Sequence, residues 1–331
     1  MLLQGGDEAL SFGHVGVELL GFLGSYALYG AVGARLVGPR LLGGAVARGR
    51  DGNASTGVAL IGAAGALTSL ATMVIGAAQR AAEHNQTVGA ALASGGAPFA
   101  AQAGLLAAAI LGLLLASRRI GAGWHLAGLA ALGLALRNGL TGRWAALVNP
   151  LHVLAGGLWL GTLAVLVAVL FPVLLRGDAV GYDVGVRPGG SRLDALVRRF
   201  SVLALASSAL LGVTGVITAW RHLGRVDALW TSPYGWALDA KLVLVAGIAA
   251  FGFYNWRVVT PALSAGTGDA RMLQSSRREV LLGLAVLLVT AVLVSLPAPA
   301  EEKEHHGRPA GAPAGTPPGT PANAPAQPPP G

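Results

Sequence analysis

Long apolar stretches dominate the chain, and charged residues or Gly and Pro separate them. Each stretch has about 20 mostly apolar residues, the length that a transmembrane helix needs. No stretch alternates apolar and polar residues at period two, as a membrane β-barrel strand would. The pattern predicts an all-α, polytopic transmembrane helical bundle of about eight spans, at roughly 12–36, 56–78, 98–117, 122–140, 151–175, 200–220, 237–259 and 279–297.

Composition strengthens this prediction. Charged residues make up 11% of the 331 residues, against roughly 25% in a typical soluble protein. The hydrophobic fraction is 53% and the mean hydropathy is +0.62, so the chain has too few polar side chains to cover a globule. The chain has no cysteine, which excludes disulfides and thiolate metal sites. Its 50 glycines suit close helix packing in lipid.

The basic residues are distributed unevenly between the two sets of loops. The segments after spans one, three, five and seven carry 15 arginines, whereas the alternate loops carry 5. Because cytoplasmic loops are rich in Lys and Arg, both termini are expected outside the cytoplasm. The net charge of +8 is therefore a topology signal, and we expect no nucleic-acid partner. No GxxxxGK[ST] loop is present, so we expect no nucleotide.

The chain divides into a membrane domain and a tail. Residues 1–297 form the predicted transmembrane domain. Residues 298–331 hold ten of the 18 prolines and no apolar side chain other than alanine, which predicts a disordered extracytoplasmic tail. The cluster at 301–306 is expected to be a solvated charged stub rather than a weak metal site.

Polar residues recur at helical spacing inside three predicted spans. The polar face of the first span holds His14, Glu18, Gly21, Ser25 and Tyr29. That of the second holds Thr68, Thr72, Gly76, Gln79 and Glu83, and that of the sixth holds Thr214, Thr218 and His222. Such faces either line a path or pack the bundle through interhelical hydrogen bonds, and packing is the favoured reading for the second span.

Four histidines are the sharpest chemical signal. His14, His84, His152 and His222 lie near the predicted outer ends of spans. Neutral imidazole suits copper, zinc and haem iron, although a lone interfacial histidine also serves as an amphipathic anchor. These four, with Glu18, are the candidate metal ligands.

Further candidates lie on the fifth and seventh spans. Pro150 is expected to start the fifth span, in which Trp159 follows His152 at helical spacing and GLWLG at 157–161 allows close approach of another helix. Ser232-Pro233-Tyr234-Gly235 is read as a turn before the seventh span. Within that span, Lys241 either snorkels outward or pairs inward with an acid such as Glu18. Asp239 could balance a metal charge, and Asn255 could cap or anchor the helix.

Residues 138–261 resemble the copper resistance protein D (CopD) family of bacterial inner-membrane proteins. The resemblance rests on four segments, LTGRWAALVNPLHVLAGGLWLG at 140–161, RRFSVLALASSALLGVTGV at 198–216, WTSPYGWALDAKLVLVAG at 230–247 and FYNWRVVTP at 253–261. It implies a multi-pass inner-membrane protein linked to copper import or tolerance. It places His152, Trp159, Tyr234, Lys241 and Asn255 on family-typical positions. Where the family often has Gly-His-Ala, this chain reads Gly142-Arg143-Trp144.

Three functions follow as hypotheses. The first is copper transport, with copper received at the outer face by His14, His152 and His222, and no enzymatic activity. The second is a haem b oxidoreductase or electron carrier with two axial histidines. The third is an assembly factor for a respiratory metalloenzyme. Membrane lipid surrounds the chain in each case, and any periplasmic copper-binding partner is expected to be a separate protein.

Overall fold

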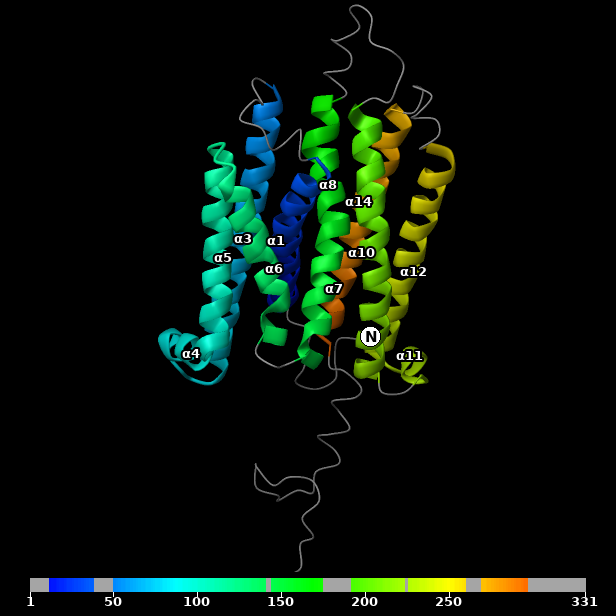
Figure 1. Cartoon of the computed structure of the whole chain (residues 1–331). Helices are drawn as coiled ribbons and strands as arrows, with labels where there is room; N and C mark the ends of the chain where they lie inside the picture. Colours follow the sequence, from blue (N-terminus) through cyan, green and yellow to red (C-terminus); the bar gives the residue numbers. More distant parts are fainter. Residues whose placement is uncertain are drawn as a thin grey trace, which may run out of the picture.

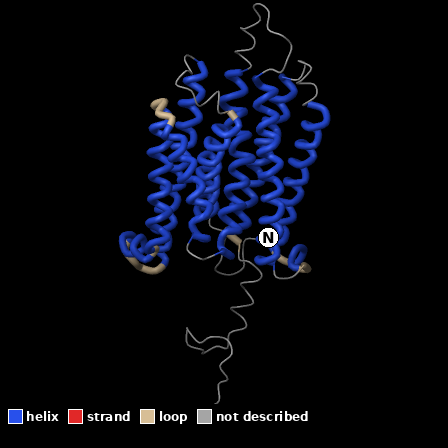
Figure 2. Tube along the Cα trace, viewed as in Figure 1, coloured by secondary structure: helices blue, strands red, loops and turns tan. Residues whose placement is uncertain are grey.

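The described part of the chain is helical throughout. The computed structural model describes residues 12–38, 50–140, 144–174, 192–223, 226–259 and 269–296, and these contain no strand (Figure 2). The long helices run alongside one another as one bundle (Figure 1). The predicted tail at 298–331 lies outside the described residues. The all-α prediction is confirmed for the described part.

A long helix lies at each of the eight predicted ranges, and shorter helices connect some of them. In chain order they are α1 (Phe12–Val37), α3 (Arg50–Glu83), α4 (Val88–Ser94), α5 (Gly96–Ser117), α6 (Ala122–Leu140), η1 (Trp144–Leu147), α7 (Val148–Gly156), η2 (Gly157–Gly161), α8 (Thr162–Val165), η3 (Leu166–Leu170), α10 (Arg192–Leu223), α11 (Ala228–Thr231), α12 (Pro233–Tyr254), η4 (Asn255–Val259) and α14 (Asp269–Val294).

Three of these elements are π-helical turns within longer helices. The π-helices η2 and η3 interrupt one continuous helix from Val148 to Leu174, and η4 extends α12. A π-helix widens the turn by one residue, and such insertions occur often at functional sites. Apolar periodicity alone did not predict them.

Six of the described helices are long and apolar enough to cross a membrane. They are α1, α3, α5, the helix from Val148 to Leu174, α10 and α12. Helices α6 and α14 lie in the same bundle but carry more polar residues, so the count of eight spans stays a prediction.

Two predicted helix starts need correction. Ser232 is not part of a free turn, because its hydroxyl accepts a hydrogen bond from the Gly235 backbone N–H and caps α12, with Pro233 as the first helical residue. Pro at that position needs no backbone donor, which suits a helix start. Pro150 does not begin its helix, because α7 starts two residues earlier at Val148, where the short helix η1 leads into it.

Glycines bring the backbones of α1 and the η2 turn into direct contact. A side chain on Gly161 would meet the carbonyl of Tyr26, and one on Gly30 would meet the backbone of Gly161. The prediction that the GLWLG segment allows close approach of another helix is confirmed, and that helix is α1. Gly24 and Gly65 join α1 to α3 in the same way.

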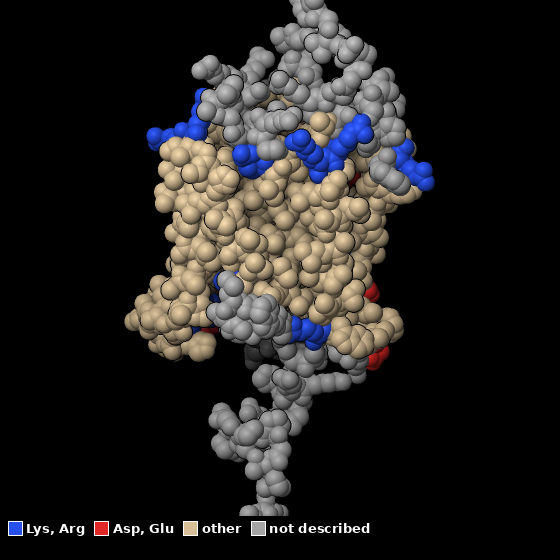
Figure 3. Space-filling model, in the orientation of Figure 1, with Lys and Arg blue, Asp and Glu red and all other residues tan. Residues whose placement is uncertain are grey.

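The outer surface is apolar around its middle and carries its charged side chains toward the two ends (Figure 3). Side chains such as Leu205, Val216 and Val243 are more than 70% exposed, which is the exposure expected of lipid-facing positions. On the face shown in Figure 3, Lys and Arg form a rim at the upper end, where α5 ends and α10 begins. We call this the basic end, and the end that carries α4 and α11 the opposite end.

Candidate functional site

The opposite end of the bundle carries a polar cluster built by three helices. Helices α7 and α12 begin there and α10 ends there (Figure 1). Side chains from the three helices meet through hydrogen bonds, a ring stack and one charge interaction. The members of this opposite-end cluster are Asn149, His152, Thr214, Thr218, His222, Tyr234 and Lys241.

His152 is held by α10 through one ring nitrogen. Its Nδ1 lies 2.9 Å from the Thr214 hydroxyl oxygen. That hydroxyl donates its hydrogen to the Leu210 carbonyl at 2.7 Å, so it accepts from His152. Nδ1 therefore carries the proton, and Nε2 keeps its lone pair. No described residue hydrogen-bonds to Nε2, so this half-buried imidazole keeps one nitrogen with the lone pair that metal ligation requires.

His222 presents its ring in the same tautomer, further along the same face of α10. Its Nδ1 donates to the Thr218 carbonyl at 2.9 Å, which leaves Nε2 unprotonated. Its ring stacks on Tyr234 of α12, with centroids 6.0 Å apart and planes 7° from parallel. The Thr218 hydroxyl donates to the Asn149 amide oxygen of α7 at 3.2 Å. The predicted polar face of α10 thus points at α7 and α12.

Lys241 brings a positive charge to this cluster from α12. It is half-buried and interacts electrostatically with His152. No described residue forms an ion pair with it, so the predicted pairing with Glu18 is absent from the described part of the chain. Asp239 is exposed on another face of the same helix. A cation that interacts with His152 would oppose a metal ion on its ring.

The other predicted ligands lie apart from this cluster. His14 is exposed near the start of α1, and Glu18 is half-buried one turn further on. His84 is exposed just beyond the end of α3 and donates from Nδ1 to the Arg80 carbonyl. Trp159 packs against the main hydrophobic core. Among the described residues, no three His, Cys, Asp or Glu side chains gather as a metal-binding group.

The polar faces of α1 and α3 serve helix contacts. The hydroxyls of Ser25 and Ser69 lie 3.4 Å apart across the α1–α3 interface. Those of Thr68 and Thr72 bond to carbonyls of their own helix, Ala64 and Ser69. Of the predicted polar faces, Ser25 of the first span thus makes an interhelical contact, whereas Thr68 and Thr72 of the second bond within their own helix.

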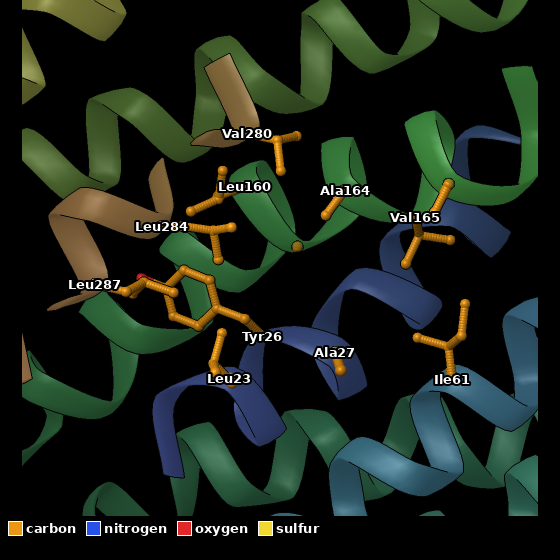
Figure 4. Close-up of a pocket in the computed structure, with 12 residues that line it drawn as sticks. Leu23, Tyr26, Ala27, Ile61, Leu160, Ala164, Val165, Val280, Leu284 and Leu287 are labelled. Atoms are coloured by element: carbon orange, nitrogen blue, oxygen red, sulfur yellow. The ribbon is translucent and has the colours of Figure 1, made fainter. Parts of the chain in front are cut away.

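The bundle also holds an apolar cavity, away from the histidines. It has a volume of about 220 Å³ and lies between α1, α3, the η2–η3 region and α14 (Figure 4). Its lining is aliphatic apart from Tyr26. Such a surface supplies no set of metal ligands, so the chemistry of the molecule lies at the polar clusters.

A second polar network joins α12 to α14 at the basic end. Asn255 donates from Nδ2 to Glu279 Oε1 and accepts from the Ser275 hydroxyl at 2.6 Å. These bonds join Asn255 to the neighbouring helix, and its role as a cap or anchor of its own helix stays a prediction. Glu279 was missed by the sequence interpretation, because it follows Arg277 and Arg278 and reads as part of an interfacial charged segment. Its 6% exposure sets it apart from them.

Comparison with known proteins gives these sites a context. Residues 194–293 match the family model of copper resistance protein D. The resemblance to the CopD family is confirmed. Together with the apolar helices, it places the chain among multi-pass membrane proteins. No solved structure matches the chain.

The CopD match covers part of both polar clusters. It starts later than the 138–261 expected from the sequence and extends through most of α14. Thr214, His222, Lys241 and Glu279 lie inside it, whereas His152 lies before it. The departure from the family pattern at Gly142-Arg143-Trp144 concerns two residues outside the described part and a third, Trp144, whose side chain is not described.

A curated relative shares part of the chain. The copper transport protein CutJ of Bacillus subtilis (strain 168) is 28% identical over 178 residues. The aligned segment covers 51% of this chain and 30% of that protein, so the chain spans well under two thirds of that relative's length.

Proposed function

We propose that this chain is a membrane copper transport protein that receives copper at the opposite-end cluster and moves it toward the basic end. The observation that carries this proposal is the geometry of His152. Its ring is fixed by Thr214 of another helix, and the remaining nitrogen is unprotonated and without a hydrogen-bond partner among the described residues. Second-helix hydrogen bonds of this kind orient histidine ligands in metal sites. The name of the aligned relative, a copper transport protein, supports copper as the ion.

The topology of the proposal has eight spans with both termini outside the cytoplasm. Its support is the rim of Lys and Arg at the basic end, because cytoplasmic segments carry such an excess (Figure 3). The opposite-end cluster then faces outward, and transport from it is import. A separate periplasmic copper-binding protein is the proposed donor.

Two histidines, His152 of α7 and His222 of α10, make a stepwise route along the polar face of α10. His222 lies eight residues beyond Thr214, or about 12 Å along the helix axis. His222 is nearer the opposite end of the bundle, so in this proposal it binds copper first and His152 binds it second.

The proposal assigns a transport role and no enzymatic one. Cellular copper content tests it, measured in cells that express wild type or His152→Ala at matched membrane levels. We expect raised copper with wild type and the empty-vector value with the variant. His125→Ala is the matched control, since His125 is exposed near the start of α6, at the basic end. Equal copper in His152→Ala and wild-type cells would refute the proposal.

A further inference from the structure

Glu279 is the buried acid at the basic end of the bundle. It lies on α14 with 6% of its surface exposed, directly after the exposed Arg277 and Arg278. Glu279 is thus buried one residue after the exposed arginines of the basic end. An ionisable residue that the helices of a membrane protein bury there commonly marks an ion or proton route.

One amide holds the carboxyl group. Asn255 Nδ2 donates to Glu279 Oε1, and Asn255 Oδ1 accepts the Ser275 hydroxyl at 2.6 Å. Asn255 is the first residue of the π-helical turn η4. Its amide bonds to two residues of α14, Glu279 and Ser275. The network fixes one oxygen of the carboxyl group and leaves the other without a protein donor in the described part of the chain.

The described charged residues of the helices packed against α14 do not pair with Glu279. These helices are chiefly α1, α12, η4, α8 and η3. Helices α8 and η3 carry no charged residue. The charged or titratable residues of α1, α12 and η4 are His14, Glu18, Arg35, Asp239, Lys241 and Arg257. Glu279 forms an ion pair with none of them. The Arg257 guanidinium lies 5.7 Å from the centre of the Phe253 ring.

A buried carboxylate without a cation is costly, so the group needs a bound positive charge. The ligand set is too small for a metal ion, since one carboxyl group is present and the Asn255 oxygen is already bonded. A single proton neutralises the carboxylate and needs no further ligand. We propose that Glu279, held by Asn255 and Ser275, is a proton-exchange site at the basic end of the bundle.

The exchange is a simple acid dissociation. The carboxylic acid releases its proton to water at the basic end and becomes a carboxylate, and it takes a proton back by the reverse step. The Asn255 amide donates to the same oxygen in both states, so the network survives the change. Coupling of this exchange to copper movement rests on the proposed function, whereas the exchange itself does not.

Infrared difference spectroscopy of the full chain in lipid tests the exchange without copper. A step to lower pH should produce the carbonyl band of a protonated carboxyl group, and the band should shift in deuterated water. We expect Glu279→Gln to lose one such band and Glu83→Gln, which removes an exposed carboxylate at the end of α3, to keep it. If the Gln variant does not fold, Glu279→Asp keeps the acid and should move the band. Identical spectra for wild type and the Glu279 variants would overturn the proposal.

Proton movement in proteoliposomes tests the coupling. A pH-sensitive dye inside the vesicles reports protons when copper is added outside. We expect the copper-driven signal with wild type, its loss in Glu279→Gln, and unchanged copper binding by that variant in detergent. Loss of the signal together with the infrared band supports coupling. A retained signal in Glu279→Gln would overturn the coupling, and absence of copper movement in wild type would instead contradict the proposed function.

Discussion

The His152 ring on α7 lies 2.9 Å from the Thr214 hydroxyl on α10, and this single bond sets which nitrogen of the imidazole is protonated. Because the only hydrogen of the Thr214 hydroxyl goes to the Leu210 carbonyl one turn earlier, this hydroxyl faces His152 as an acceptor. Threonine in helices often bonds back to its own backbone, and here that bond fixes the tautomer of a histidine on the neighbouring helix.

Thr214→Val should weaken copper binding at His152 by about 10–100-fold, because the ring loses the partner that orients it. The variant has nearly the same volume, so helix packing should be preserved. Copper affinity is measured by competition with a chromogenic chelator. Thr214→Ser, which keeps the hydroxyl, is the matched control and should bind as wild type does. Equal affinities for the Val and Ser variants would contradict this assignment.

Lys241→Gln should strengthen copper binding. At separations on the order of 10 Å and an effective dielectric constant of about 20, two like unit charges repel by on the order of 1–2 kcal/mol, so removal of the ammonium charge should tighten binding by about tenfold. Asp239→Asn provides the control, because that carboxylate is exposed and water screens it. Weaker binding in Lys241→Gln would mean that the ammonium orders the cluster instead of opposing the ion.

His222→Phe should slow copper uptake while leaving the fold intact. Phenylalanine can still stack on Tyr234, a contact worth about 0.5–1.5 kcal/mol, but it offers no ligand nitrogen. Uptake is followed as cellular copper against time, and stability as the thermal midpoint of unfolding in detergent. His222→Ala should lose both uptake and part of the stability. Normal uptake in the Phe variant would remove His222 from the route.

Gly161→Ala should destabilise the protein by about 1–3 kcal/mol, since the added methyl group meets the Tyr26 carbonyl of α1 and a backbone cannot rotate away. Gly247→Ala is a matched substitution in α12, where no atom lies within 4 Å of the new carbon. It should be neutral or slightly stabilising. Thermal midpoints in detergent compare the two, and similar midpoints would show that the α1–η2 contact is looser than described.

Much of the fold could be predicted because a membrane leaves few choices. Backbone groups in lipid must bond within their own helix, so an apolar stretch such as 122–140 translates directly into a helix with the same limits as α6. Polar helix ends extend beyond the apolar stretch, which is why α3 and α10 are longer than predicted. The capping role of Ser232 was misread because a Ser-Pro pair begins turns and helices alike.

Partners across helices could not be predicted in the same way. The spacing of Thr214, Thr218 and His222 revealed one polar face, but no periodicity says that α7 and α12 lie opposite it. His14 and His84 matched His152 in predicted depth, yet depth leaves the position around the bundle undetermined. Glu279 carried no periodic signal, because burial between two helices depends on how α12 and α14 pack.

Helix α12 carries Tyr234 and Lys241 at one end and Asn255 joins it to Glu279 at the other, so both polar networks are attached to a single rigid rod. If an ion at His152 shifts α12, the shift also moves Asn255 and changes the proton affinity of the Glu279 carboxyl group. Thermodynamic linkage requires the converse effect to be equal in size. Ion binding at one end of α12 and proton binding at the other are then coupled equilibria, and α12 is the element that couples them.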